Sequence, residues 1–322
     1  MNRKKILKFL LTFFVIITLN FCLPRLMPGD PFFFLSSEQG DITATYSDEE
    51  IQRLKAYYGL DRPLLIQYIQ YIVSLARGNL GYSIYFGNEV RTIIKNRIPW
   101  SISLVLLSVI IGGFMGTSLG CLSAWMRDRM PDKILYSALV LVSEIPPFII
   151  GILFLFYLAA DWNLFPLSGG MTPFADSWSW THRFFDIVHH GFLPALTLAV
   201  VHMGGFFLIA RNSMITVINK DYITTARAKG LDSGRIIFRH ALPNAVLPVV
   251  TRMFNNLGQA VGGTILVENV FKYPGLGLLM RQAVLVRDYP LIQGIFLTVT
   301  LFVLIMNLAA DIIYKKLDPR IL

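Results

Sequence analysis

Long apolar stretches alternate with shorter polar ones along most of the chain. Six of these stretches hold about 20 or more mostly apolar residues, which is enough for a helix to cross the roughly 30 Å hydrocarbon core of a bilayer. The pattern therefore predicts an all-α membrane protein with six transmembrane helices. The predicted spans are residues 6–24, 99–124, 134–160, 192–210, 244–267 and 290–313.

Composition supports the same class. Of the 322 residues, 54% are hydrophobic and 15% are charged, whereas a soluble domain carries about 25% charged residues. A chain this apolar is not disordered. Its two cysteines, Cys22 and Cys121, lie inside apolar runs and are expected to be small core residues rather than a disulfide scaffold. The first apolar run is too long for a signal peptide and shows no cleavage site before Pro24, so we expect an uncleaved span.

The net charge of +9 is explained by topology. With six spans, both termini lie on one side of the membrane, and Lys and Arg are about three times denser on that side than on the opposite one. Basic residues collect on the cytoplasmic side of membrane proteins. Both termini are therefore predicted to be cytoplasmic, the chain is predicted to be a multi-pass protein of the cytoplasmic (inner) membrane, and nucleic-acid binding is not expected.

The longest outer segment, residues 24–98, carries local structure of its own. Ser47 is placed to cap a short helix, with Glu50 three residues later and Gly59 as the stop signal. A second amphipathic stretch, 64–76, predicts a helix at the membrane surface. The predicted organisation is residues 1–98 for the first span with this segment, 99–322 for a five-span core, and 211–243 for a cytoplasmic loop within that core.

Motifs for nucleotide binding and metal binding are missing from the sequence. It contains no G-x-x-x-x-G-K-[ST], H-E-x-x-H or C-x-x-C motif. We interpret His189 and His190 as a solvated pair rather than as metal ligands. The chain is therefore predicted to be neither an enzyme nor a metal-binding protein.

The one long cytoplasmic segment, residues 211–243, is the most informative. Residues 221–229 are compatible with a helix, which Gly230 would end. Asp232 or Ser233 can cap a second short helix, predicted to carry Ile236, Ile237 and His240 and to end before Pro243. Two short helices joined at a glycine suit docking into a groove of a partner; an ordinary basic loop that only fixes topology is the alternative.

The spacing of this segment resembles a known motif. Thr224-Thr225-Ala226-x-x-x-Gly230 stands in the place of the E-A-A-x-x-x-G loop of bacterial ABC importer permeases. The string DYITTARAKGL (221–231), followed by His240-Ala241-Leu242 and Asn244, resembles the permeases of the dipeptide, oligopeptide, glutathione and nickel importers. Thr224 replaces the usual glutamate, and Pro243 stands where a basic residue is more usual. These departures leave open which residues contact the ATPase.

Further motifs extend the resemblance from end to end. They are Pro28-Gly29-Asp30-Pro31, Tyr58 to Pro63, Gly78 to Ser83, Arg97-Ile98-Pro99, Gly262-Gly263, Glu268 to Phe271, Pro274 to Gly277, Arg287 to Pro290, Asn307 to Asp311 and Tyr314 to Arg320.

This resemblance implies a type I ABC importer permease fold and a set of partners. A second, similar permease would complete the pathway, two ATPase subunits would bind below, and an extracytoplasmic solute-binding protein would deliver the substrate. ATP and Mg²⁺ would be bound by the ATPase subunits, and this chain would bind no cofactor. The resemblance places the ATPase contact on Asp221, Thr224, Thr225, Ala226, Arg227, Gly230, Leu231 and His240.

The translocation path is expected to show as polar groups inside spans, because such groups are costly in lipid. Glu144 lies about ten residues into the third predicted span, or about 15 Å deep. It is a candidate to meet an ammonium group or a cationic metal chelate, and pairing with a neighbouring helix is the alternative. His202 is a second path candidate or a packing residue. Arg252 is either a partner of Glu144 or a side chain that reaches the cytoplasmic face.

The sequence therefore predicts the permease subunit of an ATP-driven importer of dipeptides or oligopeptides. A nickel, metal-chelate or glutathione importer is the alternative within the family. An ion-coupled secondary transporter would need an inverted repeat, which the sequence does not show. A membrane-embedded enzyme would need converging polar residues, and a scaffold subunit would leave Glu144 unexplained.

Overall fold

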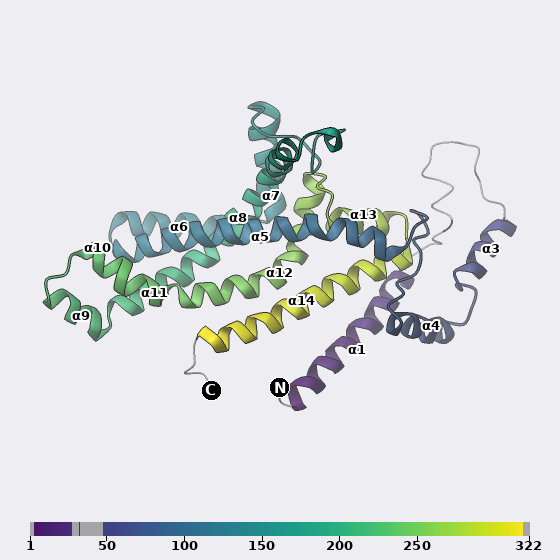
Figure 1. The fold of residues 1–322 in the computed structure, drawn as a ribbon, viewed down its shortest axis with the longest axis horizontal. Coiled ribbons are helices and arrows are strands. Elements are labelled where there is room, and N and C mark those ends of the chain that lie inside the picture. The colour runs from purple at the N-terminus through teal and green to yellow at the C-terminus, as the bar shows by residue number, and fades with distance from the viewer. Residues whose placement is uncertain (1–2, 28–31, 33–47, 318–322) are drawn as a thin grey trace. The chain divides into compact units, whose positions relative to one another are not determined.

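A computed structural model describes residues 3–27, 32 and 48–317 (Figure 1). The predicted helix cap Ser47 and the motif at 28–31 lie outside these residues. The described chain is helical, with one isolated β-bridge between Tyr82 and Glu89. It divides into two units, each described separately below. One holds residues 1–99 and 278–301, and the other holds residues 100–277 and 302–322.

The N-terminal part of the first unit contributes three of the described helices. They are α1 (Arg3–Arg25), α3 (Asp48–Tyr57) and α4 (Leu64–Ala76). Both helices predicted in the outer segment are confirmed. Gly59 adopts a φ of +66° after α3, a conformation that glycine reaches without steric cost. The buried Phe21 ring packs edge-on against Tyr68, which joins α1 to α4.

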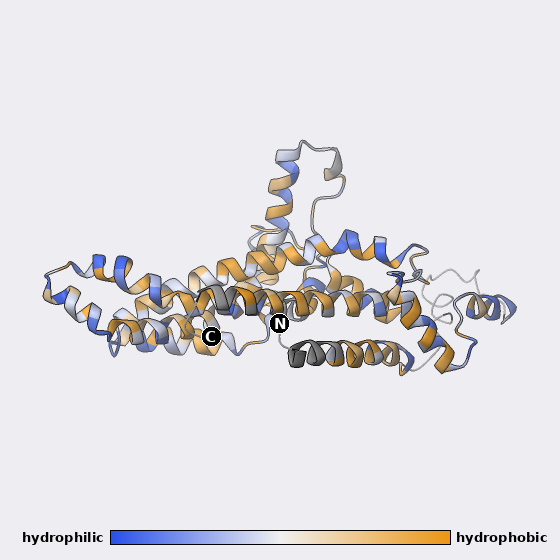
Figure 2. Ribbon diagram, turned by 60° about the horizontal axis from the view of Figure 1, so that its bottom comes forward, coloured by the Kyte–Doolittle hydropathy of each residue, from blue (hydrophilic) through white to orange (hydrophobic). Residues whose placement is uncertain are grey.

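Two long helices dominate the second unit. They are α5 (Val90–Trp125), whose first turns belong to the first unit, and α8 (Trp180–Ile218). Each is much longer than the roughly 20 residues that cross a bilayer core, so it extends beyond that core. The remaining major helices are α12 (Leu247–Val270), α13 (Leu276–Leu285) and α14 (Tyr289–Leu317), the last two shared between the units. Figure 2 shows that hydrophobic residues cover much of these helices.

Three predicted spans lie inside helices that are long and apolar enough to cross a membrane, namely α5, α8 and α14. The predicted span 134–160 does not form one continuous helix. Its two parts, α6 (Met130–Ser143) and α7 (Pro147–Phe154) with the π-helical η1 (Leu155–Asp161), meet at 99°. The remaining two predicted spans coincide with α1 and α12, so the count of six and the orientation stay predictions.

The bend between α6 and α7 has a local cause. Pro146 is extended (φ −54°, ψ 134°), and Pro147 begins α7. A residue before proline is driven away from helical dihedrals, and proline has no backbone N–H to donate. The predicted third span, 134–160, is therefore a bent pair of helices in the structure, and the two adjacent prolines account for the bend.

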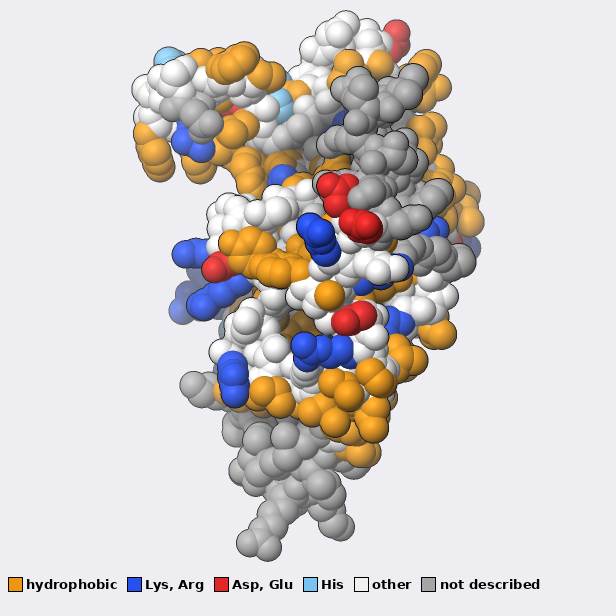
Figure 3. Space-filling model, turned by 90° about the vertical axis from the view of Figure 1, so that its right-hand side faces the viewer, with side chains coloured by type: hydrophobic (Ala, Val, Ile, Leu, Met, Phe, Trp, Pro, Cys, Tyr) orange, Lys and Arg blue, Asp and Glu red, His pale blue; other side chains and the backbone are white. Residues whose placement is uncertain are grey.

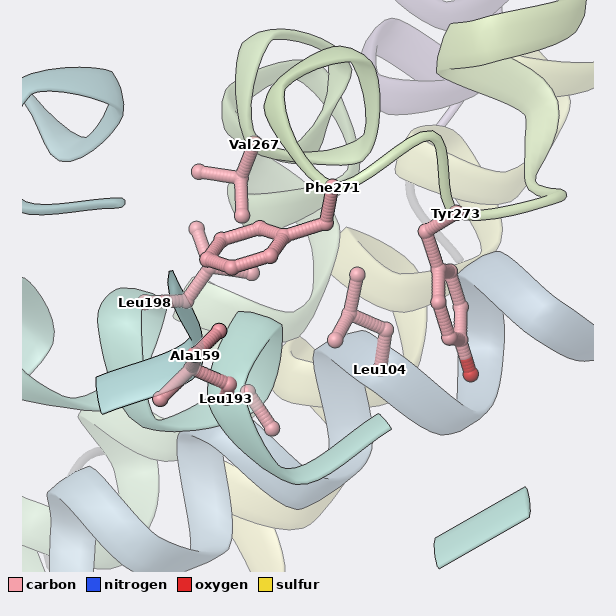
Figure 4. Close-up of a cluster of buried hydrophobic side chains, with 8 residues drawn as sticks. Leu104, Ala159, Leu193, Leu198, Val267, Phe271 and Tyr273 are labelled. Carbon is pink, nitrogen blue, oxygen red and sulfur yellow. The ribbon is translucent and has the colours of Figure 1, made fainter. Parts of the chain in front are cut away.

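The core of the second unit lies where α5, α8 and α12 meet η1. Phe271, Leu198 and Val267 lie together with Ala159 and Leu193, next to Leu104 and Tyr273 (Figure 4). All of these side chains are buried. Full burial of an aliphatic or aromatic side chain is worth about 1.5–3 kcal/mol.

A buried carboxylate holds the chain at the start of α13. Glu268, which is fully buried, accepts hydrogen bonds from Ser101 Oγ at 2.6 Å and from the Gly277 backbone N at 2.6 Å. Ser101 in turn accepts a hydrogen bond from the Leu276 N at 2.8 Å. A Cβ at Gly275 would overlap this carboxylate, so the glycine is required for the close approach. The network satisfies helix donors that have no partner within the helix.

A second buried carboxylate plays the same part at the start of α14, within the first unit. Asp288 accepts hydrogen bonds from Ser83 Oγ at 2.5 Å, Tyr85 N at 3.0 Å and Leu291 N at 3.1 Å. Burial raises the pKa of Asp288, while these hydrogen bonds act to lower it. The carboxyl group thereby fastens the loop at 83–85 to the first turn of α14.

Close contact of α5 with α8 depends on glycines, which allows a sharp test of the packing. A Cβ at Gly116 would lie 2.5 Å from the Met203 carbonyl oxygen, whereas a Cβ at Gly205 would meet nothing within 4 Å. Gly116→Ala should therefore destabilise the chain by about 1–3 kcal/mol. Gly205→Ala should stabilise it by up to about 1 kcal/mol. The midpoint temperature of unfolding in detergent measures both, and equal shifts would contradict the packing.

Candidate functional site

The cytoplasmic segment predicted from the sequence, residues 211–243, begins inside α8, which ends at Ile218, and continues into α9 (Asp221–Ala228). Helix α9 carries Asp221 in its first turn and Arg227 in its last, so both charges favour the helix dipole. Gly230 adopts a φ of +75°, and the Leu231 N donates to the Ala226 carbonyl at 3.3 Å. The predicted helix and its glycine stop are both confirmed.

The second predicted helix continues further than expected. Asp232 caps it by accepting a hydrogen bond from the Gly234 N at 2.8 Å, as predicted. The chain then runs without a break through α10 (Ser233–Arg235), the π-helical η3 (Ile236–Ala241) and α11 (Leu242–Ala245). The predicted end before Pro243 was wrong, because the helical chain continues from η3 into α11, where Pro243 lies in the first turn.

One face of α9 is anchored in apolar contacts. Ile223 is fully buried and Ala226 nearly so. They pack in one cluster with Met214 and Val217 of α8 and with Ile236 of η3. Because α9 shares this cluster with the end of α8, a displacement of α9 acts on α8 directly.

The opposite face of α9 is open. Of the eight residues that the resemblance assigns to the ATPase contact, five are exposed, two are half-buried and one is buried. The exposed residues are Asp221, Thr224, Thr225, Arg227 and Gly230, the half-buried ones are Leu231 and His240, and the buried one is Ala226. Tyr222, which the sequence reasoning missed, is 44% exposed, and its hydroxyl accepts a hydrogen bond from Asn244 Nδ2 at 3.2 Å.

A buried ion pair lies one turn of α8 before this cluster. Asp132 in the first turn of α6 receives two hydrogen bonds from Arg211 of α8, at 2.9 and 2.8 Å. Ser123, near the end of α5, donates to the same carboxylate. The Arg211 guanidinium also lies 5.4 Å from the centre of the Tyr136 ring. This group, named the helix-end clamp, joins α5, α6 and α8 beside the segment that leads to α9. The sequence reasoning did not identify it.

The two path candidates lie near a contact of α6 with α8. Glu144 follows the last residue of α6 at the bend and is exposed in the isolated chain. The preceding Ser143 packs against Gly204, two residues after His202. His202 is partly buried, and its Nε2 atom has no hydrogen-bond partner among the described residues. Arg252 of α12 is exposed.

The histidine pair of α8 differs from its prediction. His190 is buried, with Nδ1 2.9 Å from the Asp186 carbonyl oxygen and 3.4 Å from its carboxylate. The exposed His189 lies with Nε2 3.0 Å from the Leu164 carbonyl oxygen. The solvated-pair interpretation is therefore wrong for His190. Among the described residues there is no group of three His, Cys, Asp or Glu side chains that could hold a metal ion.

Residues 116–322 match the family described as the inner membrane component of binding-protein-dependent transport systems. This chain belongs to that family. The predicted multi-pass, inner-membrane permease is thereby confirmed. The matched region includes the helix-end clamp residues Ser123, Asp132 and Arg211, all of α9, and the bend at Glu144.

Curated relatives match nearly the whole chain. A putative peptide permease protein of Brucella ovis is 36% identical over 304 residues, covering 94% of this chain and 92% of the relative. The dipeptide transport system permease protein DppB of Escherichia coli is 33% identical over 326 residues, covering 96% and 95%. The glutathione transport system permease protein GsiC of Escherichia coli is 32% identical over 318 residues, covering 99% and 97%.

Solved structures of similar fold support the architecture. An inward-facing MetNI methionine ABC transporter matches with a TM-score of 0.56 at 15% identity, over 70% of this chain and 96% of that chain. An amino acid ABC transporter matches with a TM-score of 0.53 at 13% identity, over 70% and 94%. The predicted fold of an ABC importer permease is thus confirmed.

The helix-end clamp makes a prediction about stability. Asp132→Ala leaves the Arg211 charge without its carboxylate partner and should cost about 3–5 kcal/mol. Adding Arg211→Met should restore part of this loss, since the unpaired charge is then removed. Arg127→Ala, at an exposed ion pair with Asp128, is the matched control and should cost at most about 1 kcal/mol. Thermal unfolding in detergent tests the set; no recovery in the double variant would contradict the proposed pairing.

Proposed function

We propose that this permease moves peptides into the cell as one subunit of an ATP-driven importer. The relatives named for peptide or dipeptide transport, which match more than nine-tenths of the chain, support this substrate class. Glutathione, named for another relative, is itself a small peptide, and we treat it as a member of the same class. In this proposal the chain supplies the path and no catalysis.

The proposed assembly has a second permease of similar fold, two ATPase subunits and an extracytoplasmic binding protein. The observation that carries the proposal is the two-faced character of α9. Its outward face presents Thr224, Thr225 and Arg227 to solvent, while Ile223 anchors the inward face to the end of α8. A helix that is exposed on one side and fixed on the other is suited to receive a push from a partner.

The proposed mechanism follows from this anchoring. Closure of the ATPase subunits around ATP would press on α9, and the shared apolar cluster would pass the displacement to α8. The clamp of Asp132 and Arg211 would carry it on to α6 and α5. Nucleotide would thereby bias the permease between inward-facing and outward-facing states, with all nucleotide chemistry taking place on the partner subunits.

The docking role of α9 is tested by a charge reversal. Arg227→Glu should lower co-purification of the ATPase subunit and peptide uptake by roughly tenfold, equivalent to about 1.4 kcal/mol of binding free energy. Lys133→Glu, at an exposed position in the first turn of α6, is a matched control with the same change in charge. Membrane insertion should stay normal in both. An equal loss in the two variants would assign the effect to net charge and contradict docking through α9.

We further propose that Glu144 lies in the path and pairs with the ammonium group of a passing peptide, with His202 close by. A hydrogen bond between charged groups is worth about 1.5–3 kcal/mol, so Glu144→Gln should lower uptake of a free dipeptide at least about tenfold. Uptake of the same dipeptide with an acetylated N-terminus should change little, because it has no ammonium group. Competition assays in membrane vesicles measure both, and equal losses would show that Glu144 is structural.

A further inference from the structure

We propose that a cavity in the first unit binds a small organic molecule through an oxyanion, either a carboxylate or a phosphate. The cavity has a volume of about 520 Å³ and is lined only by residues of that unit. It lies between the end of α1, the turn after α3, one side of α4 and the first turns of α14. Pockets for small molecules have volumes of about 300–1,000 Å³.

The charged group of this cavity is Arg25, at the end of α1. Its Nε and one terminal nitrogen donate to Gln67 Oε1 at 3.1 and 2.8 Å, and the other terminal nitrogen donates to the Phe21 carbonyl at 3.1 Å. The guanidinium lies 3.7 Å from the centre of the Phe21 ring. No Asp or Glu among the described residues pairs with it. A guanidinium has five N–H donors, so it retains capacity for a carboxylate or phosphate.

A second polar group points to a ligand in the same cavity. Gln293 lines it and is 91% buried, yet its Nε2 atom has no hydrogen-bond partner among the described residues. Its own backbone carbonyl accepts a hydrogen bond from Asn20 Nδ2 at 2.8 Å, which fixes this turn of α14 to α1. A buried donor without a partner costs about 1–3 kcal/mol. An oxyanion in the cavity is the complementary partner for this amide and for Arg25.

The walls suit the organic part of such a ligand. Tyr58, Tyr71 and Tyr289 contribute aromatic rings, and Leu60 and Leu297 contribute aliphatic surface. Burial raises the pKa of Tyr58 and of Tyr71, which keeps their phenols protonated and able to donate. The nearby Asp288 carboxylate does not line the cavity and is occupied by its own donors, so it does not replace the missing anion.

The cavity reaches the surface of the first unit at α4. Figure 3 shows one face of the molecule, on which basic and acidic side chains are set among hydrophobic ones. The exposed Gln70 of α4 lines the cavity and therefore lies at its rim. An enlarged side chain at Gln70 should obstruct entry without touching the guanidinium contacts of Arg25.

The experiment measures binding to the purified full chain in nanodiscs by saturation-transfer difference NMR. The probes are trialanine, trialanine amide and glycerol 3-phosphate. Binding of trialanine but not of its amide would assign the site to a carboxylate, while binding of glycerol 3-phosphate would assign it to a phosphate. Binding of none of these, or equal binding of trialanine and its amide, would overturn the proposal.

Variants separate the cavity from other binding places and from misfolding. Arg25→Gln should weaken binding at least about tenfold, since a charged hydrogen bond is lost. Gln70→Trp should weaken it with Arg25 intact, so the test does not depend on one variant folding. Arg77→Gln, at an exposed arginine after α4 that does not line the cavity, should bind like the unmodified chain. Equal loss in Arg77→Gln, or unchanged binding in both cavity variants, would refute the site.

Discussion

The structure depends on one constraint, which is that a polar group buried away from water must find its partner within the protein. Helices meet this constraint along their length but leave donors and acceptors free at their ends. Glu268, Asp288 and Asp132 each lie fully or almost fully buried near a helix terminus. Each accepts a hydrogen bond from a serine hydroxyl and at least one more from a backbone N–H. A buried, hydrogen-bonded carboxylate therefore stabilises the chain near three helix ends.

Two of these acids, Glu268 and Asp288, explain motifs noted in the sequence. Glu268 needs Gly275 and Gly277 close to its carboxylate, which accounts for the glycines that follow Pro274. Asp288 brings the serine at the end of the stretch from Gly78 to Ser83 against the first turn of α14. Residues that looked like separate signatures are thus parts of two hydrogen-bonded networks.

Much of the architecture could be predicted from hydrophobic pattern and local signals. The apolar stretches indicated α5, α8 and α14, and glycine positions marked the ends of α3 and α9. The pairs that hold the fold could not be predicted in this way. Ser83 and Asp288 are 205 residues apart, and Ser101 and Glu268 are 167 apart, so no local pattern records their contact.

The same distinction between local signals and contacts distant in sequence applies to the candidate site. The sequence located α9 and its exposed residues, because a helix and its glycine stop are local features. It placed Ala226 in the contact surface, whereas packing against Met214 and Ile236 turns that side chain inward. Periodicity over eight residues does not reveal which face a short helix buries when the covering residues come from other elements.

The two π-helical segments lie at mechanically distinct places. Segment η1 continues α7 beyond the bend, and η3 follows α9 and the short α10. A π-turn has a wider and weaker hydrogen-bond ladder than an α-helix, so it rearranges at lower cost. In contrast, the apolar cluster holds α9 to the end of α8, and the helix-end clamp joins α8 to α5 and α6. In the proposed mechanism, a push on α9 would therefore pass through the apolar cluster to the end of α8 and to Ile236 and Ala241 of η3.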